Sequence, residues 1–199
     1  KELLAEHRVN EAIVELERSL SMREDYHATH SELGAAHSAA GNYERAIAHY
    51  RRSLELRPDY YPDHYNWANT LRTIGRLDEA IEHYRKAVEA DPGFFQAHNN
   101  LGICRWLKNE YARAATHFRK ALEINPEHAN AQNNLAASLE KLNDDAGAAR
   151  HYRKAVEIRP GYENAMNGLA WVLATSSDDV VRDGDEALRL ADKLCRGTR

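Results

Sequence analysis

Residues 95–128 read FQAHNNLGICRWLKNEYARAATHFRKALEINPEH. The pattern recurs every 34 residues over four copies, without an insertion or a deletion. The recurring residues include the series Ala46, Ala80, Ala114 and Ala148, the series Tyr50, Tyr84, Phe118 and Tyr152, and the series Pro58, Pro92, Pro126 and Pro160. A fixed period of this length is typical of a stacked array of structural units, with a core that runs along the array.

Each copy predicts two helices joined by a tight turn. Small or inward-facing residues recur at the fourth, seventh, eighth and eleventh positions of the first helix, which is a helical spacing. The turns fall at Gly41, Gly75, Asn109 and Asn143. Glycine and asparagine best tolerate the left-handed conformation that closes a helix. A second helix follows, for example over residues 78–90, and a proline ends the copy.

The combination of Leu-Gly, an aromatic residue or Leu, Ala, Tyr or Phe, Ala and Pro resembles the tetratricopeptide repeat (TPR), in a bacterial-type array. The resemblance covers nearly the whole chain. It implies an all-α fold, a right-handed α-solenoid of helix-turn-helix repeats. The departures from the family pattern are His30, His64, His98 and Gln132, where the family often has Trp, and Ser53, where Ala is usual.

We predict a single TPR domain over residues 1–199. It comprises a partial repeat at 1–26, full repeats at 27–60, 61–94, 95–128 and 129–162, and an atypical terminal repeat at 163–199 with a lengthened turn at 175–183. Because the chain opens without an initiator Met, we expect it to be a fragment. The partial repeat carries an apolar stripe of Leu3, Leu4, Val9, Ile13, Leu16 and Leu20 that an upstream helix is expected to cover.

Composition excludes several function classes. The net charge of -4 is mixed in sign, so no basic stripe predicts nucleic-acid binding. Cys104 and Cys195 are too few and too far apart for a disulfide framework or a zinc site. No apolar run approaches the roughly 18 residues of a membrane span, so membrane insertion is not expected. The absence of a signal peptide slightly favours the cytoplasm, although a leader could have been removed.

The implied superhelix would line its concave groove with first helices, and asparagines recur there. Asn66, Asn100 and Asn134 share one groove position, and Asn99, Asn133 and Asn167 share its neighbour. An Asn amide offers a donor and an acceptor, so it can pair with one peptide unit of an extended chain. This series resembles the asparagine ladder of O-linked N-acetylglucosamine transferases. The alternative is that these amides are solvated or bond within and between helices.

Further groove positions carry aromatic and charged residues that could anchor a partner, as interface hot spots do. They are Tyr65, Asn69, Arg72, Trp106 and Trp171. Trp106 is the strongest candidate, because core packing alone does not require an indole at its position. A shared role in packing between repeats is an equal alternative. Ile103 and Leu107 fall on the same predicted side.

Other chemistries are not supported. The Lys of the carboxylate clamp that receives chaperone tails is replaced by Ser31, Tyr65, Asn99 and Asn133. The second helices carry one histidine each, at His49, His83, His117 and His151. Packed helices lie about 8–10 Å apart, which is too far for these side chains to share a zinc ion. We therefore predict no metal, no cofactor and no catalytic activity.

Three functions remain open from the sequence. The first is a scaffold that binds a peptide or partner protein in its groove. The second is a substrate-recruiting or targeting arm of a larger enzyme, such as a glycosyltransferase or sulfotransferase. The third is a homo-oligomer assembled through the terminal repeats, because the apolar residues Leu188, Leu190, Ala191 and Leu194 are expected to be only partly covered by the preceding repeat.

Overall fold

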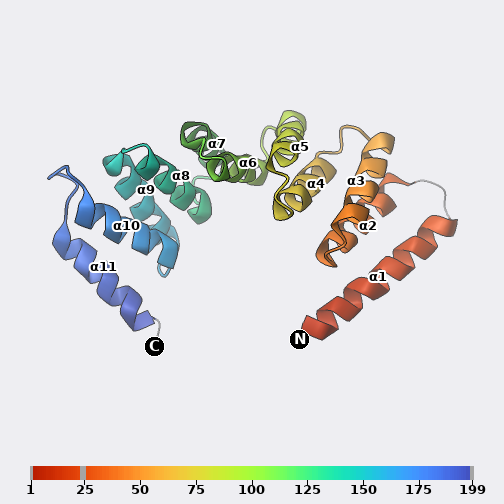
Figure 1. The fold of residues 1–199 in the computed structure, drawn as a ribbon, viewed down its shortest axis with the longest axis horizontal. Coiled ribbons are helices and arrows are strands. Elements are labelled where there is room, and N and C mark those ends of the chain that lie inside the picture. The colour runs from red at the N-terminus through yellow and green to blue at the C-terminus, as the bar shows by residue number, and fades with distance from the viewer. Residues whose placement is uncertain (1, 23–25, 198–199) are drawn as a thin grey trace. The chain divides into compact units, whose positions relative to one another are not determined.

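The computed structural model describes residues 2–22 and 26–197, with side chains described for residues 8–22 and 26–196. Within these ranges the chain forms eleven α-helices and no strand (Figure 1). The helices are α1 (Glu2–Met22), α2 (His27–Ala39), α3 (Tyr43–Leu56), α4 (Tyr61–Thr73), α5 (Leu77–Ala90), α6 (Phe95–Leu107), α7 (Tyr111–Ile124), α8 (Ala129–Lys141), α9 (Asp145–Ile158), α10 (Glu163–Thr175) and α11 (Gly184–Gly197). The predicted all-α, helix-turn-helix solenoid fold is confirmed.

The helices fall into two compact units, Lys1–Ala97 and His98–Arg199, called unit 1 and unit 2. In unit 1, α2 packs against α3, and α4 packs against α5. Contact between α3 and α4 joins the two helix pairs. In unit 2, α8 contacts both α7 and α9, and α10 contacts both α9 and α11. The even-numbered helices from α2 to α10 are thus the first helices of the repeats. The single-domain organisation and its repeat boundaries stay a prediction.

The predicted turns adopt the left-handed conformation. The backbone φ is +75° at Gly41, +78° at Gly75, and +60° at both Asn109 and Asn143. A side chain in this conformation is strained unless it is small or can bond locally, which explains why only glycine and asparagine occupy the position. The turns let each second helix fold back onto the first.

A large aromatic ring of the second helix lies under a small residue of the first. In unit 2 the Phe118 ring is fully buried against Gly102, where the Cβ of any larger residue would lie 2.6 Å from the ring. Tyr50 and Gly34 repeat this contact in unit 1. Gly168 allows Tyr152 to approach α10 in the same way. The first two contacts set how closely the two helices of a repeat can pack, and the third sets how closely α10 can approach α9 of the preceding repeat.

In three of the four full repeats, the histidine of the second helix bonds to the fourth residue of the repeat, a pairing that the sequence analysis missed. In the remaining full repeat, His117 Nδ1 makes no hydrogen bond with the described residues. The Nδ1 atoms of His64 and His83 lie 3.1 Å apart, and those of His30 and His49 lie 3.0 Å apart. In the last full repeat, His151 Nδ1 bonds Gln132 Oε1 at 2.7 Å. The imidazoles are therefore structural links between the helices of a repeat.

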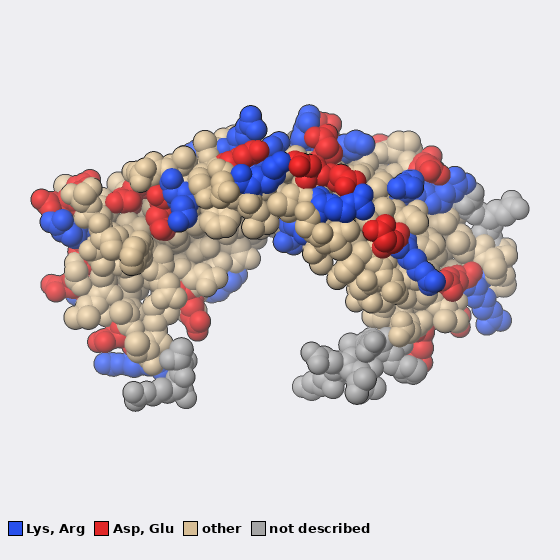
Figure 2. Space-filling model, viewed as in Figure 1, with Lys and Arg blue, Asp and Glu red and all other residues tan. Residues whose placement is uncertain are grey.

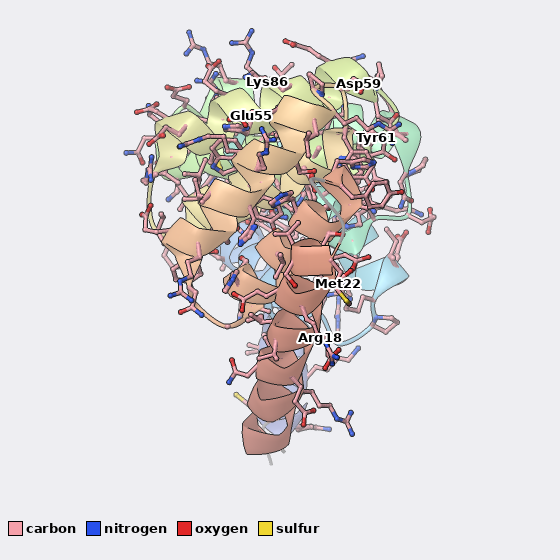
Figure 3. All side chains as sticks on the ribbon, turned by 90° about the vertical axis from the view of Figure 1, so that its right-hand side faces the viewer. Arg18, Met22, Glu55, Asp59, Tyr61 and Lys86 are labelled. Atoms are coloured by element: carbon pink, nitrogen blue, oxygen red, sulfur yellow. The ribbon has the colours of Figure 1, made fainter. Side chains whose placement is uncertain are left out.

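The ends of the chain are partly covered. On α1, Ile13 is buried while Val14 and Met22 are exposed, and Figure 3 labels Met22 near the end of that helix. Leu3 and Leu4 of the predicted stripe lie outside the described side chains. At the other end, Arg153 of α9 holds α11 through a two-pronged bond to Glu186, at 2.6 and 3.2 Å. No helix among the described residues is long and apolar enough to cross a membrane.

The turn geometry predicts opposite outcomes for two substitutions of Asn143. Asn143→Gly should leave the free energy of unfolding unchanged or raise it slightly, because glycine adopts φ +60° without strain. Asn143→Val should lower it by about 1–2 kcal/mol, the cost of a left-handed conformation for an ordinary L-residue. Urea denaturation followed by circular dichroism measures both. Equal stability of the two variants would contradict the assignment.

The histidine links predict acid sensitivity. Burial, followed by the neighbouring His64 and Lys86, lowers the pKa of His83 to about 4, whereas Glu79 opposes the shift. Because this pKa lies below the ordinary value of 6.5, the unfolded chain binds more protons between pH 6.5 and 4, and stability falls as the pH falls through that window. Melting temperatures measured from pH 8 to pH 4 should show this loss.

Two reciprocal substitutions separate the histidine links from general acid denaturation. His64→Gln copies the natural Gln132–His151 pair and should reduce the acid-induced loss in melting temperature, with little change at pH 7.5. Gln132→His should increase the loss. If the melting temperatures of both variants changed with pH in the same way as that of the parent protein, the histidine links would not contribute to the acid-induced loss of stability.

Candidate functional site

A pocket of about 320 Å³ lies on the first-helix side of unit 2, between α6 and α8. It is lined by Ile103, Trp106, Leu107, Phe118, Asn133, Asn134 and Ala137. None of these side chains is ionisable, and two amides supply the only polar side-chain groups apart from the indole of Trp106. Pockets that bind ligands typically combine apolar walls with a few placed polar groups, as here.

The pocket exists because one repeat has a small residue where the preceding one has a large residue. Ala137 and Ile103 occupy the same position of successive repeats, so the space beside Ile103 is not filled from α8. Phe118, which Gly102 admits beneath α6, closes the inner end. Trp106 lies half-buried at the wall, edge-on to Tyr111 with ring centroids 5.9 Å apart.

Trp106 takes part in the packing of unit 2 and also lines the pocket, so it can serve both as a packing residue and as an anchor for a partner, the two roles that the sequence left open. The indole Nε1 is buried and makes no hydrogen bond among the described residues. The ring therefore contributes apolar surface to the site, and it is held in place by the packing.

The asparagines of α6 and α8 form a chain of hydrogen bonds with one another. Asn133 Nδ2 donates to Asn134 Oδ1 at 3.4 Å, and Asn134 Nδ2 donates to Asn99 Oδ1 at 3.2 Å. Asn99 Nδ2 in turn donates to Asn100 Oδ1 at 3.2 Å. The amides are therefore not independent of one another. They bond within and between the helices of neighbouring repeats, which is the alternative to a ladder of separate peptide-binding groups.

The two predicted residues of α10 lie beside a different pocket. Asn167 and Trp171 line a space of about 510 Å³ between α10 and α11, together with Leu188 and four alanines, Ala170, Ala174, Ala187 and Ala191. Trp171 is 62% exposed and Leu188 is 66% exposed. This is the apolar end surface that the sequence predicted would be only partly covered.

In unit 1 two of the predicted site residues, Asn69 and Tyr65, make side-chain contacts within their own repeat. Asn69 Oδ1 accepts the hydroxyl of Tyr84 at 2.6 Å. The Tyr65 ring lies 4.7 Å from that of Phe94. Asn66 is half-buried, and its main-chain carbonyl accepts the Thr70 hydroxyl at 3.0 Å. Arg72 is half-buried, with a buried Nε that bonds to no described residue.

Unit 1 also has a pocket of about 540 Å³ on its second-helix side that the sequence did not indicate. The pocket is lined by Trp67, which replaces the Leu found at this position in the other repeats and contacts His83 with ring centroids 3.9 Å apart and ring planes tilted by 33°. Arg51 lies over the indole at 5.9 Å. Glu55 and Lys86, labelled in Figure 3, line the same pocket with opposite charges.

No metal-binding arrangement is found in the part of the chain that the structure describes: no group of three or more His, Cys, Asp or Glu side chains is placed to hold an ion. Cys104 is buried as predicted, and Cys195 is exposed on α11. The site in unit 2 is therefore suited to binding through apolar contact and amide hydrogen bonds.

The asparagine chain predicts a specific stability difference. Asn99 is buried, at 7% exposure, and Asn99→Ala removes the acceptor of Asn134 Nδ2. The expected loss is about 1–3 kcal/mol in the free energy of unfolding. Asn167→Ala, at the equivalent exposed position of the next repeat but one, should change stability by no more than about 0.5 kcal/mol. Chemical denaturation that gave the two variants equal stability would contradict the structural role of Asn99.

Comparison with known proteins places the chain in a family. Two sequence models of the tetratricopeptide repeat match it, one over residues 65–128 and 109–163 and the other over residues 25–93. A comparison with curated protein sequences gives no match. The solved structures that resemble it include MamA, with a TM-score of 0.76 and 22% identity over 85% of this chain and 90% of that one.

Two further structures share the fold. YrrB, described as a TPR protein with an unusual peptide-binding site, has a TM-score of 0.75 and 19% identity over 91% of each chain. PilF of Pseudomonas aeruginosa has a TM-score of 0.73 and 22% identity over 86% of this chain and 76% of that one. Together with the sequence matches over residues 25–163, these similarities show that the chain belongs to the tetratricopeptide repeat family.

Proposed function

We propose that this protein is a non-catalytic interaction scaffold that binds an extended peptide segment of a partner protein on the first-helix face of unit 2. The observation that carries the proposal is the uncharged apolar pocket between α6 and α8, bordered by the amides of Asn133 and Asn134. Extended peptides present one N–H and one C=O per residue, and amide side chains can pair with both. Apolar side chains of the peptide would supply the buried area.

The distribution of charge supports this face over the opposite one. Charged side chains of both signs gather over second helices, such as α5 in unit 1 and α7 in unit 2 (Figure 2). Many of them pair within one helix, as Lys120 does with Glu123 at 2.6 Å. Exposed pairs of this kind contribute little to binding. Arg105 of α6 is likewise paired, with Glu110 at 2.7 Å, which leaves the pocket side of α6 and α8 neutral.

The fold of the family supports a protein or peptide partner, and the structure of YrrB is described as that of a TPR protein with a peptide-binding site. Among the described residues, no Lys or Arg side chain lines the pocket between α6 and α8 to attract nucleic acid, and we propose no cofactor there. The role of a targeting arm in a larger enzyme stays a prediction.

The exposed apolar surface of α10 and α11 favours a second candidate, self-association. Trp171 and Leu188 would bury their exposed ring and methyl groups against a second copy, since surfaces of this kind mark interaction sites. Light scattering on the intact protein should then show a dimer that dissociates in the Leu188→Glu variant. A protein that is monomeric at high concentration would exclude this candidate.

The peptide-binding proposal predicts a loss of affinity at one amide. A peptide selected from a random display library should bind the intact protein, and Asn133→Ala should weaken that binding at least tenfold. Substitution of Asn133 removes a rim amide that makes only a long bond of 3.4 Å, so the fold should persist in a circular dichroism spectrum. Isothermal titration calorimetry measures the affinity.

The matched control lies on the other side of the same unit. Thr116→Ala combined with Arg119→Ala changes the outer face of α7 and should leave the affinity unchanged. If no library peptide binds, or if the α7 variant weakens binding as much as Asn133→Ala does, the first-helix face of unit 2 is not the binding surface.

A further inference from the structure

The pocket between α6 and α8 has a size and chemistry that define one kind of occupant. Resting on the proposed function, we infer that it is a specificity pocket for a single uncharged apolar side chain of the bound peptide, of the leucine, methionine or phenylalanine class. The peptide main chain would pass the amide of Asn133 at the rim. The inference thus concerns which peptides bind, whereas the proposed function concerns whether peptides bind.

The dimensions favour one large side chain. The pocket volume of about 320 Å³ lies at the lower limit of sites that enclose a small organic ligand. The walls come from Ile103, Leu107 and Ala137, and Phe118 closes the inner end. Leu107 is 49% exposed, so an inserted side chain would also cover apolar surface that is now in contact with water. Burial of this kind contributes to affinity in proportion to the apolar area removed from water.

The charge of the lining excludes ionised side chains. No Lys, Arg, His, Asp or Glu lines the pocket, so an inserted ammonium or carboxylate group would find no counter-charge. Desolvation of an unpaired charge is costly, and an apolar wall cannot compensate for it. A neutral apolar side chain meets no such penalty. The pocket therefore selects against charged residues as well as for apolar ones.

The asparagine chain supplies a polar contact of defined direction at the rim. Its bonds all run the same way, from Asn133 through Asn134 and Asn99 to Asn100. Asn133 uses its Nδ2 in this chain, and its Oδ1 accepts no hydrogen bond from the residues that the structure describes. An amide oxygen at the beginning of such a chain can accept a main-chain N–H of the peptide. This bond would orient the peptide beside the pocket without reading its other side chains.

A double-mutant cycle tests the pocket directly. A library peptide that binds the intact protein is prepared in versions with Leu, Ala, Lys or Glu at each apolar position in turn. At one position, replacement of Leu by Ala should weaken binding at least tenfold, and Lys or Glu should weaken it further. Ala137→Leu, which fills the pocket, should weaken the Leu peptide at least tenfold but the Ala peptide less than threefold, because the Ala peptide has no side chain to displace.

Two further variants keep the test informative. Ala35→Leu adds the same side chain at the equivalent exposed position of unit 1 and should not affect binding. Leu107→Lys places a charge at the rim of the pocket, where its half-exposed position favours an intact fold, and should weaken the Leu peptide as Ala137→Leu does. Circular dichroism confirms that each variant is folded.

The outcomes separate the inference from the proposed function. If no peptide binds the intact protein, the proposed function fails and the inference with it. If a peptide binds but tolerates Lys or Glu at every position, the specificity pocket is refuted while the scaffold function stands. The same holds if Ala137→Leu and Leu107→Lys leave the affinity of the Leu peptide unchanged.

Discussion

The structure depends on one steric constraint, the close approach of a buried aromatic ring to a small residue of the facing helix. Where Phe118 lies against Gly102, a methyl group on the glycine could not fit without moving the ring. This contact fixes the separation of α6 and α7, and the contact of Tyr50 with Gly34 does the same for α2 and α3. Gly34 and Gly102 occupy the same position of their repeats, so these two helix pairs are built on the same close contact.

The first and second helices of the repeats present two chemically different sides. Second helices carry the charged residues, many of which are paired with neighbours one turn away on the same helix. First helices in unit 2 contribute small, apolar and amide side chains, and a hollow forms where the small Ala137 follows the larger Ile103 at the same position of successive repeats. We propose that selectivity for a bound peptide arises at this hollow.

The sequence alone predicted the helices, the turns and the family, because each of these follows from residues at fixed spacing within one repeat. It was less informative about the site. Asn69 was predicted as a groove residue, but its side chain holds the Tyr84 hydroxyl. The bond from Asn134 to Asn99 links different repeats. Such contacts depend on side-chain direction and on the size of neighbours in the adjacent repeat, which periodicity does not specify.

The histidine links explain the most conspicuous departure from the family pattern. The Pro58 carbonyl can only accept, so His64 Nε2 carries the proton that it donates there at 3.2 Å, and His64 Nδ1 must then accept from His83. Gln132 reproduces both roles: its Nε2 donates to Pro126 O at 3.1 Å, and its Oε1 accepts from His151. The Trp that the family often has at this position possesses a donor but no acceptor. Where a histidine on the second helix forms this link, it therefore restricts the fourth residue of the repeat to side chains that accept a hydrogen bond at one end while they donate one at the other.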